Sequence, residues 1–185
     1  MTPQDADLRC TTGLLDRWSW HVRAAEALAA TGNRASALLL IDLDNVPLLA
    51  AVHGDPAGDA VLQAAASILT DALRATDIAG HGGHGGDEFL VLLPARDRQL
   101  GELIARRIRA RIRRAIIPTL SAHGEPIIIT DVRASVGVAI HDPSTARTLT
   151  LDDLLRQADA ALLAARNRGG DQTVVAGTRT ARQPV

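Results

Sequence analysis

The chain has 185 residues, a formal net charge of −1 and 46% hydrophobic residues, of which few are aromatic. This length suits one domain with an aliphatic core, and the near-zero charge gives no indication of a nucleic-acid or membrane partner. Cys10 is the only cysteine, which excludes an intrachain disulfide, and we find neither a signal peptide nor an apolar run of membrane-spanning length. We therefore expect a soluble, cytoplasmic protein.

Helical and strand-like segments alternate along the chain, which favours an α/β or α+β fold around a central sheet. The predicted helices are residues 13–30, 59–73, 100–117 and 151–166. The predicted strands are residues 35–43, 77–79, 89–93 and 127–140, with a loop at 54–58 and a glycine-rich hairpin turn at 80–86. The ends, 1–11 and 177–185, are predicted to be flexible tails, so that residues 12–176 form a single domain.

The strongest local motif is the run Gly85-Gly86-Asp87-Glu88-Phe89, in which two carboxylates follow a pair of glycines. The glycines permit a tight hairpin, and carboxylates at its exit can border a cleft. Taken alone, the motif favours a solvated hairpin tip, because Gly and Asp are ordinary turn residues.

A second acidic pair changes that interpretation. Asp42-Leu43-Asp44 ends a buried apolar strand, where a carboxylate is costly unless a cation or a hydrogen-bond donor compensates it. If this strand end lies beside the hairpin, Asp42, the Leu43 carbonyl, Asp87 and Glu88 form an all-oxygen cluster of the kind that Mg²⁺ prefers. The sequence therefore predicts a site for a metal ion and a phosphate.

Six motifs in the same order resemble the GGDEF family, the diguanylate cyclases. They are Thr12-Gly13-Leu14 with Arg17, Asp42-Leu43-Asp44, Gly54 with Gly58-Asp59, Gly85-Gly86-Asp87-Glu88-Phe89, Ser135-Val136-Gly137-Val138-Ala139 and Ala158-Asp159-Ala160-Ala161-Leu162. The resemblance covers nearly the whole chain. It implies a central, mostly antiparallel five-stranded sheet surrounded by helices, related to the palm of nucleotidyl cyclases and polymerases.

The resemblance also implies an activity. In this family two domains, each holding one GTP, meet head to head as a homodimer and condense the two nucleotides into cyclic di-GMP, releasing pyrophosphate with the help of Mg²⁺ or Mn²⁺. Phosphoryl transfer of this kind requires charge neutralisation at the α-phosphate and an activated 3′-oxygen. GTP and cyclic di-GMP are thus the expected partners.

Family roles are carried over to matching positions. Asp42, the Leu43 backbone oxygen and Asp87 resemble the metal ligands, and Glu88 resembles the carboxylate that holds a second ion or assists deprotonation of the hydroxyl. Asp42, Asp87 and Glu88 are thereby the implied catalytic residues. The implied substrate-binding residues are Asp59, which resembles the guanine-reading carboxylate, with Arg166, Asn45 and Val46.

Three positions depart from the family pattern. Ala50 replaces a guanine-contacting Asn, Pro47 replaces a phosphate-facing Lys, and Gly170 replaces an Arg, for which Arg168 is a candidate substitute. Two hypotheses follow: a diguanylate cyclase of weak activity, or a degenerate domain that binds GTP or cyclic di-GMP as a regulatory module. The intact carboxylates favour the cyclase.

Arg74 and Asp77 resemble the R-x-x-D inhibitory site at which the family binds its product, and Arg107 matches a secondary Arg that clamps it. Seven residues separate Asp77 from the signature, where the family has five. The alternative is an ordinary Arg and Asp at a helix end.

Two other features have simpler interpretations. The basic run at 106–114 is predicted to be a solvated helix face rather than a nucleic-acid or membrane surface, because its Ile positions are required by the core. The scattered histidines are predicted to be surface residues rather than zinc ligands, because none has a ligand partner at the right spacing. This prediction covers His53, His81, His84, His123 and His141.

Overall fold

A computed structural model describes residues 12–82, 86–144 and 149–177, so that the predicted tails at 1–11 and 177–185 lie outside the described residues except for Gly177. The strands are β1 (Ser36–Asp44), β2 (Ile78–His81), β3 (Glu88–Leu93), β4 (Ile117–Leu120), β5 (Pro126–Ile129), β6 (Arg133–His141) and β7 (Thr173–Val175). The helices are α1 (Arg17–Ala30), α2 (Val46–His53), α3 (Asp55–Ala72), α4 (Arg98–Arg113) and α5 (Leu151–Asn167).

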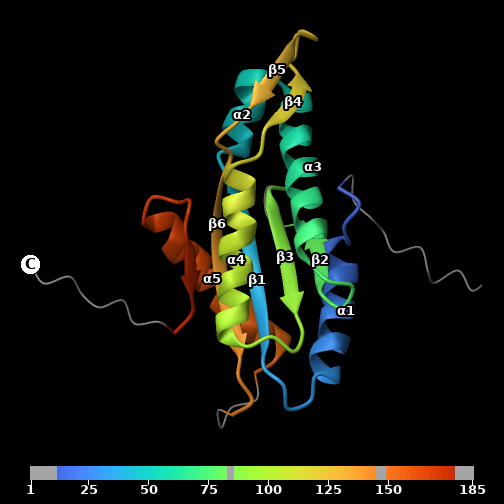
Figure 1. The fold of residues 1–185 in the computed structure, drawn as a ribbon, viewed down its shortest axis with the longest axis vertical. Coiled ribbons are helices and arrows are strands. Elements are labelled where there is room, and N and C mark those ends of the chain that lie inside the picture. The colour runs from blue at the N-terminus through green and yellow to red at the C-terminus, as the bar shows by residue number, and fades with distance from the viewer. Residues whose placement is uncertain (1–11, 83–85, 145–148, 178–185) are drawn as a thin grey trace, which may run out of the picture.

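Five strands form the central sheet in the order β2-β3-β1-β6-β7. The first four pair antiparallel, and only β7 runs parallel to its neighbour β6. The predicted fold class, a mostly antiparallel five-stranded sheet surrounded by helices, is therefore confirmed (Figure 1). A two-stranded sheet of β4 and β5 lies with α2 at one end of the molecule (Figure 1).

Helices cover both faces of the sheet, and the central strand β1 is apolar at nearly every position. Alternate side chains of a strand point to opposite faces: Leu39 and Ile41 belong to a core with α3 and α4, whereas Leu38 and Leu40 belong to a core with α1 and α5. This explains the continuous apolar run, which is typical of a strand buried on both sides.

Gly137 of β6 allows α5 to lie directly on the sheet. A Cβ at this position would be 2.5 Å from the Leu162 backbone nitrogen and closer still to the Ala158 carbonyl oxygen. No side chain larger than hydrogen fits between this strand and this helix without displacing backbone atoms. The close contact fixes the position of α5, whose C-terminal turn carries Arg166.

The predicted elements differ from the structure in identifiable places. The first helix begins at Arg17 rather than residue 13, because Asp16 caps it by accepting a 2.7 Å hydrogen bond from the Ser19 N–H. Helix α2 was not predicted, and α3 begins at Asp55, inside the predicted loop. The predicted strand 127–140 is divided into β5 and β6, with Asp131 between them in the left-handed conformation (φ 56°).

Two further differences concern the end of α4 and the strand β7. The helix predicted to reach residue 117 ends at Arg113, and β4 begins at Ile117. The short edge strand β7 was not predicted. Within the described part of the chain, no helix has both the length and the hydropathy that a membrane span requires.

Candidate active site

The sequence-predicted carboxylates meet where β1 ends beside the β2–β3 hairpin. Asp42 is the cross-strand partner of Glu88, and the Leu43 N–H donates a 3.1 Å hydrogen bond to the Asp87 carbonyl. Residues paired across neighbouring strands have Cβ atoms about 5 Å apart. The two acidic motifs, more than forty residues apart in the sequence, therefore lie side by side at the end of β1.

Asp42 is 4% exposed and is paired with Arg166 of α5. The Arg166 Nε donates a 3.1 Å hydrogen bond to Oδ1 of Asp42, and the guanidinium also forms an ion pair with Oδ2. Burial raises the pKa of Asp42 to about 6, although Arg166 opposes this shift, and the charges of Asp87 and Asp44 raise it further. Negative charge at this position is thus compensated incompletely.

Glu88 has a similar environment. Its side chain is 17% exposed, and its Oε2 lies 3.8 Å from the guanidinium of Arg17 on α1. Burial raises the pKa of Glu88, while Arg17 and Arg166 lower it and Asp159 and Asp87 raise it. A carboxylate whose pKa is raised accepts a proton more readily than an exposed one.

The donor set fits a hard divalent cation, because it consists of carboxylate and carbonyl oxygens whose repulsion a cation would relieve. Among the described residues, however, no three Asp, Glu, His or Cys side chains already converge as metal ligands. The guanidinium of Arg166 contacts both carboxylate oxygens of Asp42.

Asp44, the second acid of β1, has a different role. Its Oδ1 accepts a 2.9 Å hydrogen bond from the Ser135 hydroxyl, and its Oδ2 accepts one of 2.9 Å from the Asp171 N–H. Gly170 lies close to this carboxylate, since a Cβ there would be 2.9 Å from Oδ2 of Asp44. With Gly170 at φ 71°, both backbone conformation and space favour glycine where the family has Arg.

The segment after α5 is held from the other side by α4. Arg109 donates hydrogen bonds of 2.6 Å and 2.7 Å to the carbonyl and carboxylate of Asp171, and Arg113 forms an ion pair with the same carboxylate. This cluster, which we call the Asp171 clamp (Arg109, Arg113, Asp171 and Asp44), links α4 to the end of β1. Sequence reasoning missed it, because Arg109 and Arg113 belong to a basic run that was interpreted as a solvated face.

The implied nucleotide-binding residues lie on α2 and α3. Asn45 precedes α2 in the left-handed conformation (φ 67°), and Val46 is buried as its first residue. Ala50 of α2 faces the start of α3: a Cβ on Gly58 would be 3.2 Å from that of Ala50. Asp59 follows immediately and is exposed. Ala50 is therefore a neighbour of Gly58, the residue before Asp59.

His81 supports the signature hairpin from β2. It is 8% exposed, its ring stacks on Phe89 with centroids 4.7 Å apart, and its Nε2 lies 2.7 Å from the Gly86 carbonyl oxygen. The prediction of surface histidines is wrong for His81 and for His141, which is 7% exposed, while His84 lies outside the described residues.

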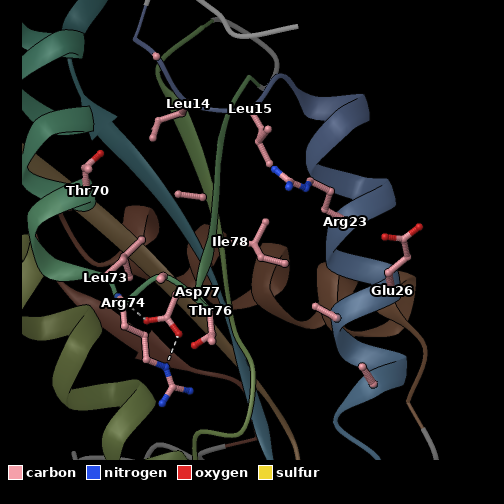
Figure 2. A pocket seen from close by; sticks show the side chains of 15 residues that line it. Leu14, Leu15, Arg23, Glu26, Thr70, Leu73, Arg74, Thr76, Asp77 and Ile78 are labelled. Carbon is pink, nitrogen blue, oxygen red and sulfur yellow. Dashed lines mark hydrogen bonds and ion pairs between the residues drawn. The ribbon is translucent and has the colours of Figure 1, made fainter. Parts of the chain in front are cut away.

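Arg74 and Asp77 lie together at the opposite end of β3. The Arg74 Nε donates a 3.0 Å hydrogen bond to Asp77, and its NH2 group donates one of 2.6 Å to the Pro94 carbonyl. Both residues line a cavity of about 810 Å³ between α1, β2 and the end of α3 (Figure 2). Since β3 has six residues and Asp77 lies beside its C-terminal end, Asp77 is about 20 Å from Glu88, which begins the strand.

Strand β2 pairs in register with β3 from Ile78, the residue after Asp77, to His81. In the long spacer before the signature, residues 83–85 lie outside the described part of the chain. Arg107 lies on the exposed side of α4, and no hydrogen bond or ion pair joins it to Arg74 or Asp77 in the described part of the chain.

The family model for "Diguanylate cyclase, GGDEF domain" matches residues 7–172. The chain belongs to the GGDEF family. Among curated relatives, the diguanylate cyclase DgcP of Pseudomonas aeruginosa is 33% identical over 167 residues, and DgcM of Escherichia coli K12 is 30% identical over 139 residues. These alignments cover 89% and 75% of this chain but only 23% and 30% of the relatives. The chain thus spans about a quarter of their length.

Solved structures agree with this assignment. The diguanylate cyclase SiaD of P. aeruginosa, solved in complex with its activator SiaC, is 31% identical with a TM-score of 0.77, over 92% of this chain and 62% of that one. The GGDEF domain of DgcB from Caulobacter crescentus, solved with c-di-GMP, has a TM-score of 0.81 over 96% of this chain and 97% of that one. At 22% identity, the DgcB comparison supports the fold alone.

Proposed function

We propose that the domain is a diguanylate cyclase that condenses two GTP molecules into cyclic di-GMP, with release of pyrophosphate, as a homodimer dependent on Mg²⁺ or Mn²⁺. The observation that carries the proposal is the pairing of Asp42 with Glu88 beside Asp87, at the end of a buried strand. These are the positions at which the family motifs place the catalytic carboxylates.

The metal would be held by Asp42, the Leu43 carbonyl oxygen, Asp87 and Glu88. When bound, it would neutralise the charge that develops on the α-phosphate and lower the pKa of the attacking hydroxyl. Glu88 would accept the 3′-hydroxyl proton, the role that the family resemblance implies for this position, and burial raises its pKa in support of that role.

Arg166 has two roles in this proposal. In the nucleotide-free domain its guanidinium compensates the buried Asp42 carboxylate. Its side chain is 47% exposed, so it can turn toward solvent without loss of core packing. When a cation takes over the compensation of Asp42, Arg166 becomes available to bind a nucleotide phosphate, which a guanidinium contacts with two parallel hydrogen bonds.

Recognition of GTP would use Asp59 for the N–H donors of guanine, and the backbone around Asn45 and Val46 for phosphate oxygens. Ala50 removes polar base contacts, and Pro47 supplies neither a positive charge nor an N–H group at the start of α2. We therefore propose weak GTP binding and slow turnover.

The decisive experiment is incubation of the purified protein with GTP and Mg²⁺, followed by chromatography of the nucleotides. The Asp87→Ala variant should lose both cyclic di-GMP formation and Mg²⁺-dependent binding of a GTP analogue. Asp152→Asn, at an exposed acid in the first turn of α5, is the matched control and should retain both. Unchanged Mg²⁺-dependent affinity in Asp87→Ala would refute the metal assignment.

The second candidate is a degenerate domain that binds GTP or cyclic di-GMP without turnover and regulates a partner. The direct Asp42–Arg166 pair favours it, because the guanidinium must be displaced before a metal can bind. Metal-dependent nucleotide binding without any product would select this alternative.

We also propose that Arg74 and Asp77 bind cyclic di-GMP outside the active site, with Arg107 as a secondary contact. The two residues share the wall of a cavity of about 810 Å³, which supports a ligand of nucleotide size (Figure 2). Calorimetry should show that Arg74→Ala weakens product binding, with Arg98→Ala on α4 as a matched control. Equal affinities would leave Arg74 and Asp77 as a helix-end ion pair.

A further inference from the structure

The hairpin of β4 and β5 packs on the corner where α2 ends and α3 begins (Figure 1). The Ala122 N–H, in the turn of the hairpin, donates a 2.8 Å hydrogen bond to the carbonyl oxygen of His53, the last residue of α2. The Thr119 hydroxyl of β4 donates one of 3.2 Å to the carbonyl oxygen of Pro56, in the first turn of α3. The hairpin therefore holds both helices at the point where they meet.

Two glycines permit close packing at this corner. A Cβ on Gly54, which separates the two helices, would be 2.7 Å from the Ala122 Cβ and 2.9 Å from the Ala122 backbone nitrogen. A Cβ on Gly58 would be 3.2 Å from the Ala50 Cβ. The turn of the hairpin thus lies directly on the corner, and α2 lies directly on the start of α3.

Helix α2 has few buried contacts of its own. The structure describes all eight of its residues, and of these only Val46 is buried. Leu48 is 63% exposed and Val52 is 66% exposed. The hairpin, in contrast, is fixed at its base, because Ile117 and Ile129 are buried in the core formed with α3 and α4. A helix with few buried contacts is locally less stable than its surroundings, so we expect the geometry of the corner to depend on the hairpin.

The corner carries Asp59, the acid proposed to read guanine. Asp59 lies three residues after Pro56, within one turn of α3. Ala50 offers no polar contact to a base, so of the two guanine-contacting positions only Asp59 can read it. A carboxylate that accepts the N1–H and N2–H groups of guanine together must be aligned with both donors, since hydrogen bonds weaken steeply at poor angles. The orientation of the first turn of α3 is therefore decisive for recognition of the base.

We propose that Thr119 is a positioning residue for guanine recognition: its hydrogen bond to Pro56 fixes the first turn of α3 and thereby the direction of the Asp59 carboxylate. This inference rests on the proposed role of Asp59 in GTP binding. It concerns selectivity for the base, which distinguishes it from an effect on stability. A loosened fold would lower the affinity for every nucleotide equally, whereas a misaligned Asp59 lowers the affinity for guanine in particular.

The test is calorimetry of the purified 185-residue chain with Mg²⁺ and the α,β-methylene analogues of GTP and inosine triphosphate, which cannot release pyrophosphate. Inosine lacks the N2 amino group of guanine, so the ratio of the two affinities measures a contact proposed for Asp59. Thr119→Val removes the hydroxyl at nearly constant size and should lower this ratio by about threefold or more, the usual effect of one hydrogen bond. Thr119→Ser retains the hydroxyl and should keep the wild-type ratio.

Two further variants are the controls. Asp59→Ala should bring the ratio close to one, and Thr130→Val, the same change at an exposed threonine directly after β5, should leave the ratio as in the wild type. The inference is overturned if Thr119→Val keeps the wild-type ratio, even with both affinities lowered equally, or if Thr119→Ser loses it. Failure of the proposed function gives a different result: a wild-type protein that binds neither analogue, or binds both equally, overturns the role of Asp59 and the inference with it.

Discussion

The two acids of β1 should affect stability in opposite directions when the protein is free of metal. Asp42 is buried with its charge only partly compensated by Arg166, so its ionisation opposes folding. Asp44 accepts hydrogen bonds from Ser135 and from the Asp171 N–H, so its carboxylate supports folding. Asp42→Asn should therefore stabilise the protein, and Asp44→Asn should destabilise it.

The magnitude follows from the pKa of Asp42, which burial raises from the ordinary value of 3.8 to about 6 in the folded protein. This raised pKa contributes stability that is present below about pH 4 and lost as the pH rises through about 6. The difference corresponds to about 3 kcal/mol at pH 8, because one pKa unit is worth about 1.4 kcal/mol. A buried amide retains some desolvation cost, so Asp42→Asn should raise the free energy of unfolding by about 1–3 kcal/mol at pH 8 and by little at pH 4.

Urea denaturation in the presence of EDTA, at pH 4 and pH 8, measures both effects. Asp44→Asn should lower the free energy of unfolding by about 1–2 kcal/mol. The amide NH2 of Asn would face a hydrogen-bond donor at one of the two places where the Asp44 carboxylate accepts a hydrogen bond. The two variants carry the same chemical change at positions two residues apart on one strand, so each is the other's control. A destabilised Asp42→Asn at pH 8, or a gain that does not depend on pH, would refute the reasoning.

Three further outcomes are expected. Gly137→Ala should lower the free energy of unfolding by more than about 3 kcal/mol or prevent folding, because the added Cβ would overlap backbone atoms of α5. Circular dichroism and thermal unfolding measure this effect. His81→Phe retains an aromatic ring beside Phe89 but loses the contact with the Gly86 carbonyl. Amide hydrogen exchange at Asp87 and Glu88 should therefore accelerate, while the amides of α3 stay protected. Unchanged exchange at Asp87 and Glu88 would contradict a supporting role for His81. The double change Ala50→Asn and Pro47→Lys should raise GTP affinity and product formation, and a variant no better than the parent would show that these positions are not limiting.

Much of the fold followed from local patterns, because the buried strand, the hairpin and the long helices each have their own periodicity. Helix α2 was missed for a physical reason: apolar residues lie on all its sides, so it has no alternation by which a short helix can be recognised. Strand β7 was missed because three residues carry no periodicity, and only its parallel pairing with β6 identifies it.

The sequence alone was sufficient to indicate the acidic site, because Asp42 ends an apolar strand and Asp87 and Glu88 leave a glycine turn. The hydrogen-bond and ion-pair partners of each acid were decided by the tertiary structure. Arg166 reaches Asp42 across 124 residues, and Asp171 holds Asp44 across 127 residues, and no local pattern encodes such pairs. Hydrogen bonds and ion pairs act over a few ångströms in space, whatever the separation along the chain, so only the packing of α4 and α5 against the sheet could assign a partner to each carboxylate.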